Sequence, residues 1–384
     1  MDRLFYCRLA EQSLAGEIIE WDVCQDILSS PELELLPLLD AAYQVRKVFT
    51  GKEVAVHIIN NAQNGYCPED CHYCAQAKTS RAEIEEYPLK PDQEILAEAK
   101  NAYEKGAFRY CMVFAGRGPS PRRVEHLACL IRDIKSQFPI QVCVSAGIMN
   151  EEATQKLKEA GLDRLNHNLN TSAGHYPNIC STHTYQDRIN TLNAAKKVGL
   201  EMCSGMILGM GESSKDVIEV ARTLRQFKAK SIPINFLVPI EGNRIKEISH
   251  LTPEYCLRVL CLFRFLNPDS ELRAAAGREG HLRSLEVMAL YPANSLFLDG
   301  YLNTKGSSRE KTLQMIKDAG FTIKSEFKVD ELLEQETSHR PVFSIDGTQS
   351  LMKGLRELRP HNLAALPPGG RPVGIKTDFK LEEK

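Results

Sequence analysis

The sequence has no long uninterrupted run of apolar residues and no dense block of basic residues. Without such an apolar run the chain is not expected to cross a bilayer. Lysine and arginine (48) nearly balance aspartate and glutamate (50), and the net charge is −2. No global field is therefore expected to attract nucleic acid or a membrane surface. The N-terminus also lacks a basic segment followed by an apolar stretch, so neither a secretory signal nor a transit peptide is expected.

Cysteine, in contrast, is plentiful: the chain of 384 residues contains 12. Because no export signal is expected, these thiols are predicted to stay reduced in the cytoplasm and to serve metal binding rather than disulfides. Three of them, Cys67, Cys71 and Cys74, follow one another at C-x3-C-x2-C spacing in a loop that contains Gly65 and Pro68.

Thiolates this close can all bind one soft inorganic centre. Tetrahedral zinc usually takes four protein ligands, and no second cysteine pair lies nearby in the sequence. An iron–sulfur cubane held by three thiolates instead keeps one iron open for a substrate or cofactor. The remaining alternative is a chance group of structural thiols, which the rarity of cysteine disfavours.

Strand-like and helix-like patterns alternate from residue 53 onward. Repeated β–α units require a parallel sheet with right-handed crossovers, and eight units fit a closed (β/α)8 barrel of the TIM type. An open doubly wound sheet is the alternative, but no G-x-G-x-x-G follows the first strand. The expected strands are 53–60, 109–115, 140–146, 164–170, 201–208, 231–239, 271–275 and 295–298. The expected helices are 92–105, 121–138, 151–160, 185–198, 215–228, 253–266, 280–290 and 308–319.

Three regions are therefore predicted. Residues 1–50 read as a helical extension, with apolar residues at helical spacing over 14–27 and 32–50. Residues 51–325 form the barrel. Residues 326–384 form a C-terminal extension that begins with one more charged helix, after which many prolines and glycines predict an extended or partly disordered appendage.

Three further cysteines, Cys111, Cys143 and Cys203, fall within expected strands. For any one of them alone, packing as a small core residue is the favoured interpretation. Because alternate side chains of barrel strands point inward, three inward thiols would converge and favour a second metal centre. Arg273 is costly to bury within its short apolar strand, so it either pairs with a glutamate or faces the same interior as these thiols. Core packing is predicted for Cys7, Cys24, Cys129, Cys180, Cys256 and Cys261.

Amide side chains mark two strands near the ligand-binding end of the barrel. Asn168 and Asn235 offer the donors and acceptors that a urea, an amide or a ribose requires, although neighbouring backbone could also satisfy them. Arg188 is either a carboxylate ligand or an ordinary exposed helix arginine. The glycines that begin with Gly205 would let backbone approach a flat ligand.

The cysteine loop, with Tyr73 before its last cysteine, resembles the radical S-adenosylmethionine (SAM) superfamily. The strand cysteines, the run Asn166-His167-Asn168-Leu169-Asn170 and the segment that begins at Arg273 resemble one family within it, the biotin synthases. The similarity covers roughly residues 50 to 322, nearly the whole expected barrel.

This resemblance implies two clusters. Cys67, Cys71 and Cys74 would bind a [4Fe–4S] cluster whose open iron chelates SAM, while Cys111, Cys143, Cys203 and Arg273 would bind a [2Fe–2S] cluster. A 5′-deoxyadenosyl radical would remove hydrogen from dethiobiotin, and sulfide of the second cluster would fill the vacated positions to give biotin. Chemistry of this kind is carried by cofactors, so no catalytic side chain is expected.

The resemblance also implies roles for further residues. Tyr73, Asn168, Asn170, Arg188, Gly205 and Ile207 would contact SAM, and Asn168 and Asn235 would contact dethiobiotin. Asn170 stands where many members carry aspartate, so its ribose contact would be uncharged. The expected partners are a flavodoxin or ferredoxin electron donor, cluster-assembly proteins and a second copy of the chain.

Two alternatives remain open. A radical SAM enzyme of hydrogenase maturation or of the thiazole pathway would keep the loop but need not keep the strand cysteines with Arg273. A non-catalytic iron–sulfur or zinc carrier would need no small-molecule pocket, against which the set of Asn168, Arg188 and Asn235 argues.

Overall fold

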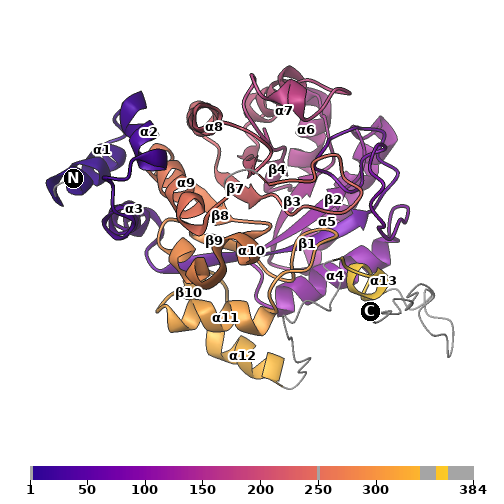
Figure 1. Ribbon diagram of the computed structural model, residues 1–384. Coiled ribbons are helices and arrows are strands. Elements are labelled where there is room, and N and C mark those ends of the chain that lie inside the picture. Colours follow the sequence, from indigo (N-terminus) through magenta and orange to yellow (C-terminus); the bar gives the residue numbers. More distant parts are fainter. Residues whose placement is uncertain (1–2, 249–250, 338–351, 362–384) are drawn as a thin grey trace, which may run out of the picture.

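The computed structural model describes residues 3–248, 251–337 and 352–361 (Figure 1). Its centre is a closed parallel barrel in which β1 pairs with both β2 and β9. Two short strands, β5 and β6, share one position beside β7, so the described strands fill eight positions around the barrel. The barrel strands are β1 (Glu53–Gln63), β2 (Arg109–Phe114), β3 (Gln141–Ser145), β4 (Arg164–Asn166), β5 (Glu201–Cys203), β6 (Met206–Leu208), β7 (Ser231–Phe236), β8 (Glu271–Ala274) and β9 (Ser295–Phe297). The short β10 (Thr322–Ile323) pairs with the start of β1. The predicted (β/α)8 barrel is confirmed.

Helices cover the outside of the barrel and follow the strands in turn (Figure 1). They are α4 (Asp92–Glu104), α5 (Pro121–Gln137), α6 (Glu151–Glu159), α7 (Tyr185–Lys197), α8 (Ser214–Phe227), α9 (Pro253–Leu266), α10 (Arg278–Leu282) and α11 (Arg309–Asp318). Many begin at a Ser, Thr or Asn whose side chain accepts a hydrogen bond from the first-turn backbone, which fixes where each helix starts. The expected helix over 280–290 is instead the short α10 followed by a 3-10 helix, Arg283–Leu290.

The N-terminal extension consists of α1 (Arg3–Leu14), α2 (Trp21–Ser29) and α3 (Leu35–Thr50), which pack beside α9 (Figure 1). The prediction of one helix over 14–27 is wrong, because the chain leaves the helix at Gly16, where φ is +71°. Arg46 joins the extension to the barrel: its Nη1 donates to the carbonyl of Leu290 at 2.8 Å and its Nη2 to that of Glu53 at 2.7 Å.

The C-terminal extension begins with a charged helix at the predicted place, α12 (Val329–Thr337). The short α13 (Leu355–Leu358) then lies against the barrel, where Arg359 forms an ion pair with Glu94 at 2.5 Å. Residues 352–361 are thus packed rather than extended. The rest of the predicted appendage, residues 338–351 and 362–384, lies outside the described residues.

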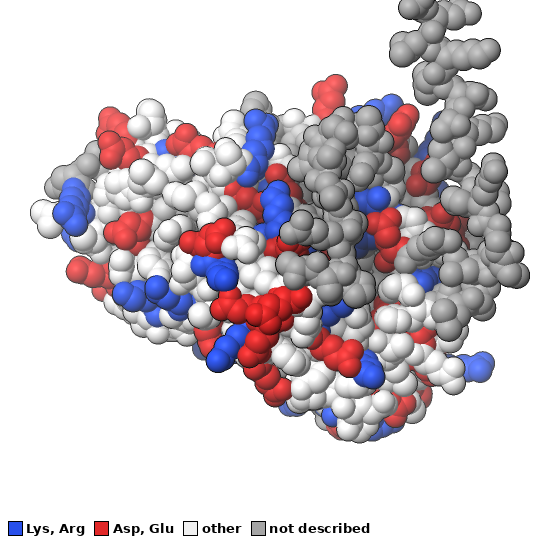
Figure 2. Space-filling view, turned by 90° about the horizontal axis from the view of Figure 1, so that it is seen from below, with Lys and Arg blue, Asp and Glu red and all other residues white. Residues whose placement is uncertain are grey.

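Charged side chains of both signs are interspersed on the face shown in Figure 2, in keeping with the small net charge. Within the part of the chain that the structure describes, no helix has the length and apolar character needed to cross a membrane.

Candidate active site

A cavity of about 280 Å³ opens at the carboxyl ends of the strands, the end where barrel enzymes bind ligands. Cys67, Cys71 and Cys74 line one part of it, and polar side chains that follow β4, together with Asn235 of β7, line another. The two sequence patterns singled out above, the cysteine loop and the strand amides, therefore meet in one cavity.

The cysteine loop is tied to a second loop, residues 179–183, that follows β4. Asp70 accepts hydrogen bonds from the backbone N–H of Ser181 at 2.9 Å and of Thr182 at 3.2 Å. The backbone N–H of His72 donates to the carbonyl of Ile179 at 2.9 Å. These contacts fix the three thiols without using any of them.

Burial keeps the loop thiols protonated in the metal-free chain. It raises the pKa of Cys74 to about 11 and raises the pKa of Cys67 as well. A hydrogen bond with Cys180, followed by burial, raises the pKa of Cys71. Binding of a metal centre by these thiols must therefore release protons.

Cys111, Cys143 and Cys203 meet inside the barrel, below the main cavity. Cys111 lies opposite Cys143 in the register of β2 and β3, and the three thiols pack together with Ala275 and Phe297. The hydrogen bond from the Cys143 thiol lowers the pKa of Cys111 and of Cys203 and raises that of Cys143. Three cysteines from three different strands thus meet at one interior point.

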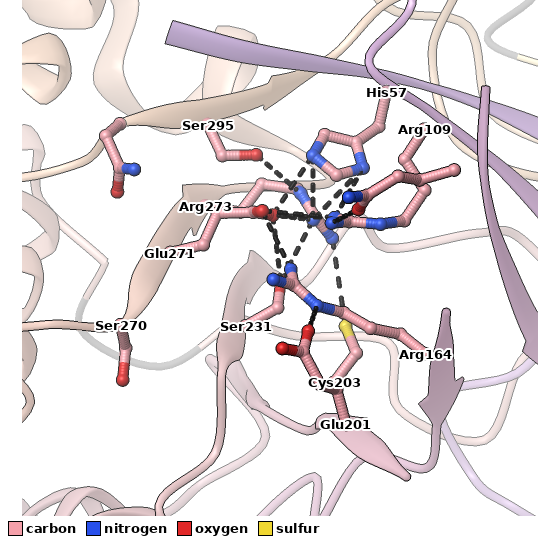
Figure 3. Close-up of polar contacts among 12 residues, drawn as sticks. His57, Arg109, Arg164, Glu201, Cys203, Ser231, Ser270, Glu271, Arg273 and Ser295 are labelled. Atoms are coloured by element: carbon pink, nitrogen blue, oxygen red, sulfur yellow. Dashed lines mark hydrogen bonds and ion pairs between the residues drawn. The ribbon is translucent and has the colours of Figure 1, made fainter. Parts of the chain in front are cut away.

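Arg273 lies beside these thiols and is only 2% exposed. Its Nη1 is 3.9 Å from Cys203 Sγ, its Nε donates to Ser295 Oγ at 2.9 Å, and its Nη2 contacts Glu271 at 2.5 Å (Figure 3). The two alternatives predicted for Arg273 are therefore both correct: it pairs with a glutamate, and it also faces the interior thiols.

Glu271 is the centre of a buried network of arginines and one histidine (Figure 3). Its carboxylate is 3.0 Å from Arg109 Nη1, 2.8 Å from Arg164 Nη1 and 3.0 Å from His57 Nε2. Burial alone would raise the pKa of Glu271, but Arg109, His57 and Arg164 hold it well below its ordinary value.

The donor set fits an anionic cluster at the interior thiols. Arg109, Arg164 and Arg273 surround a single buried carboxylate, and Glu201, which also pairs with Arg164, is half exposed. The buried guanidinium groups therefore outnumber the buried carboxylates here. Three thiolates around an iron–sulfur core supply the missing negative charge, and a buried excess of cations would otherwise be costly.

A smaller, separate cavity adjoins the main one and is lined by the interior thiols and Arg273. Asn166, Asn168 and Tyr301 line both cavities. Asn168 Oδ1 accepts from the backbone N–H of Gly205 at 3.1 Å, and Asn235 Nδ2 donates to the carbonyl of Met206 at 3.1 Å. Backbone thus orients both predicted amides along the path between the two groups of cysteines.

Tyr73, Asn170 and Arg188 also lie at the main cavity. Asn170 has a left-handed backbone, with φ at 68°, and its Nδ2 donates to Tyr73 Oη at 2.5 Å. Arg188 is 8% exposed, so the alternative of an exposed helix arginine is wrong. Its Nη1 donates to the carbonyl of Asn168 at 2.8 Å and its Nη2 to His183 Nε2 at 2.9 Å.

Gly205 has a structural role in addition to the predicted close approach to a flat ligand. Ile207 lines the main cavity, whereas Gly205 faces the neighbouring strand, and a Cβ added there would lie 1.8 Å from the carbonyl oxygen of Pro233. This close approach falls at the break between β5 and β6, where a single strand over 201–208 had been expected.

Gly205→Ala should therefore lower the free energy of unfolding by about 3 kcal/mol, since the added methyl group must push backbone aside. Denaturant unfolding of the cluster-free chain measures the change. Gly280→Ala is the matched control, because nothing lies within 4 Å of a Cβ added there. Equal stabilities of the two variants would contradict this role of Gly205.

Sequence reasoning missed His57 and Glu271. Glu271 lies two residues before Arg273, so both point to one side of β8, and this period of two was the available signal. His57 Nδ1 is 4.0 Å from Cys111 Sγ, but nothing in its apolar strand marked it out.

Comparisons with known proteins agree with these arrangements. The model of the Radical SAM superfamily matches residues 64–224, and that of the Biotin and Thiamin Synthesis associated domain matches residues 233–322. A curated biotin synthase of Magnetococcus marinus is 55% identical over 323 residues, which are 84% of this chain and 100% of that protein. One of Acaryochloris marina is 57% identical over 300 residues, 78% of this chain and 87% of that protein.

The chain belongs to the biotin synthase family. It is thus a radical SAM enzyme of the sulfur-inserting kind, as predicted, and the superfamily implies a [4Fe–4S] cluster and SAM as cofactors. Three loop thiols that face one cavity provide the donor set that such a cluster needs.

Solved structures share the fold of this biotin synthase family member at much lower identity. Methylornithine synthase (PylB) superimposes with a TM-score of 0.68 at 20% identity, over 82% of this chain and 96% of that one. The FeFe-hydrogenase maturase HydG from Carboxydothermus hydrogenoformans superimposes with a TM-score of 0.70 at 16% identity, over 87% of this chain and 82% of that one. At such identities the likeness concerns the barrel alone.

Proposed function

We propose that the protein converts dethiobiotin to biotin, with a [2Fe–2S] cluster at the interior thiols as the sulfur donor. The observation that carries the proposal is the pair of adjoining cavities, each lined by three thiols, that share Asn166, Asn168 and Tyr301. A hydrogen-abstracting centre and a sulfur source must both reach one substrate carbon. The two groups of cysteines meet that requirement, because the same asparagine side chains line the cavities of both.

Each group of cysteines would hold one cluster. Cys67, Cys71 and Cys74 would hold the [4Fe–4S] cluster, and Cys111, Cys143 and Cys203 with Arg273 would hold the [2Fe–2S] cluster. When bound, these groups and SAM supply hydrogen abstraction from an unactivated carbon and sulfur for the new bonds, which no protein side chain could supply.

The side chains of the protein would bind and orient SAM and dethiobiotin. Backbone hydrogen bonds already orient the amide side chains of Asn168 and Asn235. These amides would hold the ureido ring of dethiobiotin between the two groups of thiols. Arg188 would bind the methionine carboxylate of SAM, and Asn170 with Tyr73 would contact its ribose. Fixed amides restrict the substrate to one approach, which is how positioning accelerates a reaction.

Two further residues belong to the proposed SAM site, one at the cavity wall and one through Asn168. Ile207 offers an apolar surface at the main cavity, and Gly205 acts through Asn168 by donating its backbone N–H to that amide. The proposed partners are a flavodoxin or ferredoxin as electron donor, cluster-assembly proteins and a second copy of the chain.

The proposal is tested with protein reconstituted anaerobically with iron and sulfide. Incubation with dethiobiotin, SAM and a reductant should yield biotin together with 5′-deoxyadenosine. If deoxyadenosine forms on another substrate while dethiobiotin yields no biotin, the assignment of substrate fails although the radical SAM assignment stands.

Cys143→Ala should lose the [2Fe–2S] cluster and keep the other. The reason is that Cys143 bridges Cys111 and Cys203 by hydrogen bonds inside the barrel and has no contact with the cysteine loop. Iron and sulfide analysis should show the content of the [4Fe–4S] cluster alone. The matched control is Cys261→Ala, an equally buried thiol of α9 that should keep both clusters. Loss of both clusters, or of neither, in Cys143→Ala would contradict the assignment.

A further inference from the structure

Cys180 and His183 lie behind the cysteine loop, next to one of its thiols. Cys180 Sγ is 3.9 Å from Cys71 Sγ, and one ligand atom from each of Cys71, Cys180 and His183 lies within 4.8 Å of the other two. Cys180 is 4% exposed and His183 is 7% exposed. Core packing alone was predicted for Cys180, yet its thiol joins a soft-ligand group that the proposed reaction does not use.

The spacing of these atoms suits a tetrahedral ion. With Zn–S bonds of ~2.3 Å and Zn–N bonds of ~2.0–2.1 Å, tetrahedral geometry places two sulfurs ~3.8 Å apart and a sulfur and a nitrogen ~3.6 Å apart. The two sulfurs here are 3.9 Å apart. Cys180 Sγ is 3.3 Å from His183 Nδ1 and 3.8 Å from Nε2. Both spacings that involve Cys180 are therefore close to those of a tetrahedral zinc site.

The surroundings of His183 also prepare it for a metal. Glu69 Oε2 is 2.5 Å from His183 Nδ1, and Arg188 Nη2 donates to Nε2. This hydrogen-bond network assigns the ring proton to Nδ1 and leaves the lone pair on Nε2. A carboxylate on the far nitrogen of the ring is the usual support of a metal-bound histidine. Arg188 retains its bonds to Tyr176 and Asn168 when the ion replaces its contact with Nε2.

We propose that the chain without its [4Fe–4S] cluster binds one zinc-type divalent cation through Cys71, Cys180 and His183 Nε2, with water as the fourth ligand. The two cysteines bind as thiolates, so any thiol proton still present leaves to solvent on binding, and no electron moves. Because Cys71 also belongs to the cluster loop, the ion and the [4Fe–4S] cluster exclude one another. The site does not depend on the conversion of dethiobiotin.

Cobalt titration of the full-length, cluster-free protein under anaerobic conditions tests the site. One equivalent of Co²⁺ should bind with the visible bands of a tetrahedral thiolate site, and Zn²⁺ should displace it. Cys180→Ser and His183→Gln, two independent variants, should each lose these bands. Glu69→Gln should weaken the affinity by about 10- to 100-fold, the usual effect of removing the support of a ligand.

Two further variants show which thiols bind the ion. Cys67→Ser should keep the bands, since Cys67 is not among the three ligands, and Cys129→Ser, at an exposed thiol, should match the unmodified protein. If Cys67→Ser removes the bands while Cys180→Ser and His183→Gln keep them, the ion sits in the cluster loop and the proposal is overturned. Absence of tetrahedral bands in the unmodified protein would overturn it as well. Neither result would bear on biotin formation.

Discussion

Glu271→Gln lowers the free energy of unfolding by about 3–5 kcal/mol, the expected cost of removing one partner from a buried ion network. The carboxylate has contacts with Arg109, Arg164 and Arg273, and it is 9% exposed (Figure 3). Glutamine has nearly the same volume, so no cavity contributes to the loss. What changes is the charge, and the guanidinium groups then face one another without a buried counterion.

Urea unfolding of the cluster-free protein at one fixed pH measures this loss. Glu201→Gln is the matched control, because Glu201 also pairs with Arg164, at 2.8 Å, but is half exposed. Exposed pairs contribute about 0–1 kcal/mol, so this variant should stay close to the unmodified protein. Similar losses in the two variants would mean that burial of Glu271 does not determine its contribution.

The sequence predicts the barrel because its signal is repeated. Each β–α unit forces a parallel neighbour, so errors at single boundaries leave the architecture unchanged. The errors are local. The chain between 201 and 208 forms two strands because Gly205 lies against Pro233, and the chain at Gly16 ends a helix that apolar spacing alone would continue. Spacing of apolar residues carries no information about a close approach between two strands.

In the candidate site, too, residues within strands were predicted correctly and a residue of a loop was missed. Cys111, Cys143 and Cys203 converge as predicted, because each lies within a strand and strand pairing fixes its height. The position of Cys180 could not be predicted from strand pairing. It lies in the loop after β4, and the path of that loop depends on the bonds of Asp70 to residues 181 and 182. Contacts of this kind come from tertiary structure, which local pattern does not encode.

Charge inside the barrel links the fold to the proposed chemistry. The cations beside β8 exceed the buried carboxylates, so the interior favours whatever brings negative charge to the thiols. An arginine that already contacts Cys203 needs no rearrangement to meet a cluster there. The same arginines would also favour the binding of a new anionic group at these thiols.

Arg188→Lys should raise the KM for SAM by about 10- to 100-fold, which corresponds to one lost hydrogen bond of a charged group. The guanidinium is held at three points, by Tyr176, Asn168 and His183, and still lines the cavity. Lysine keeps the charge but offers a single nitrogen, so it cannot hold this position and bind a carboxylate as a planar fork does.

Steady-state kinetics of deoxyadenosine formation at saturating dethiobiotin and reductant measure the KM. The matched control is Arg222→Lys, since Arg222 also bonds a backbone carbonyl, that of Ile19 at 2.8 Å, but lies in α8 against the N-terminal extension. Both variants keep the charge, so a general loss of stability would appear in both, whereas a rise in KM confined to Arg188→Lys identifies a SAM contact. An unchanged KM in Arg188→Lys, with both clusters retained, would show that the carboxylate of SAM binds elsewhere in the cavity.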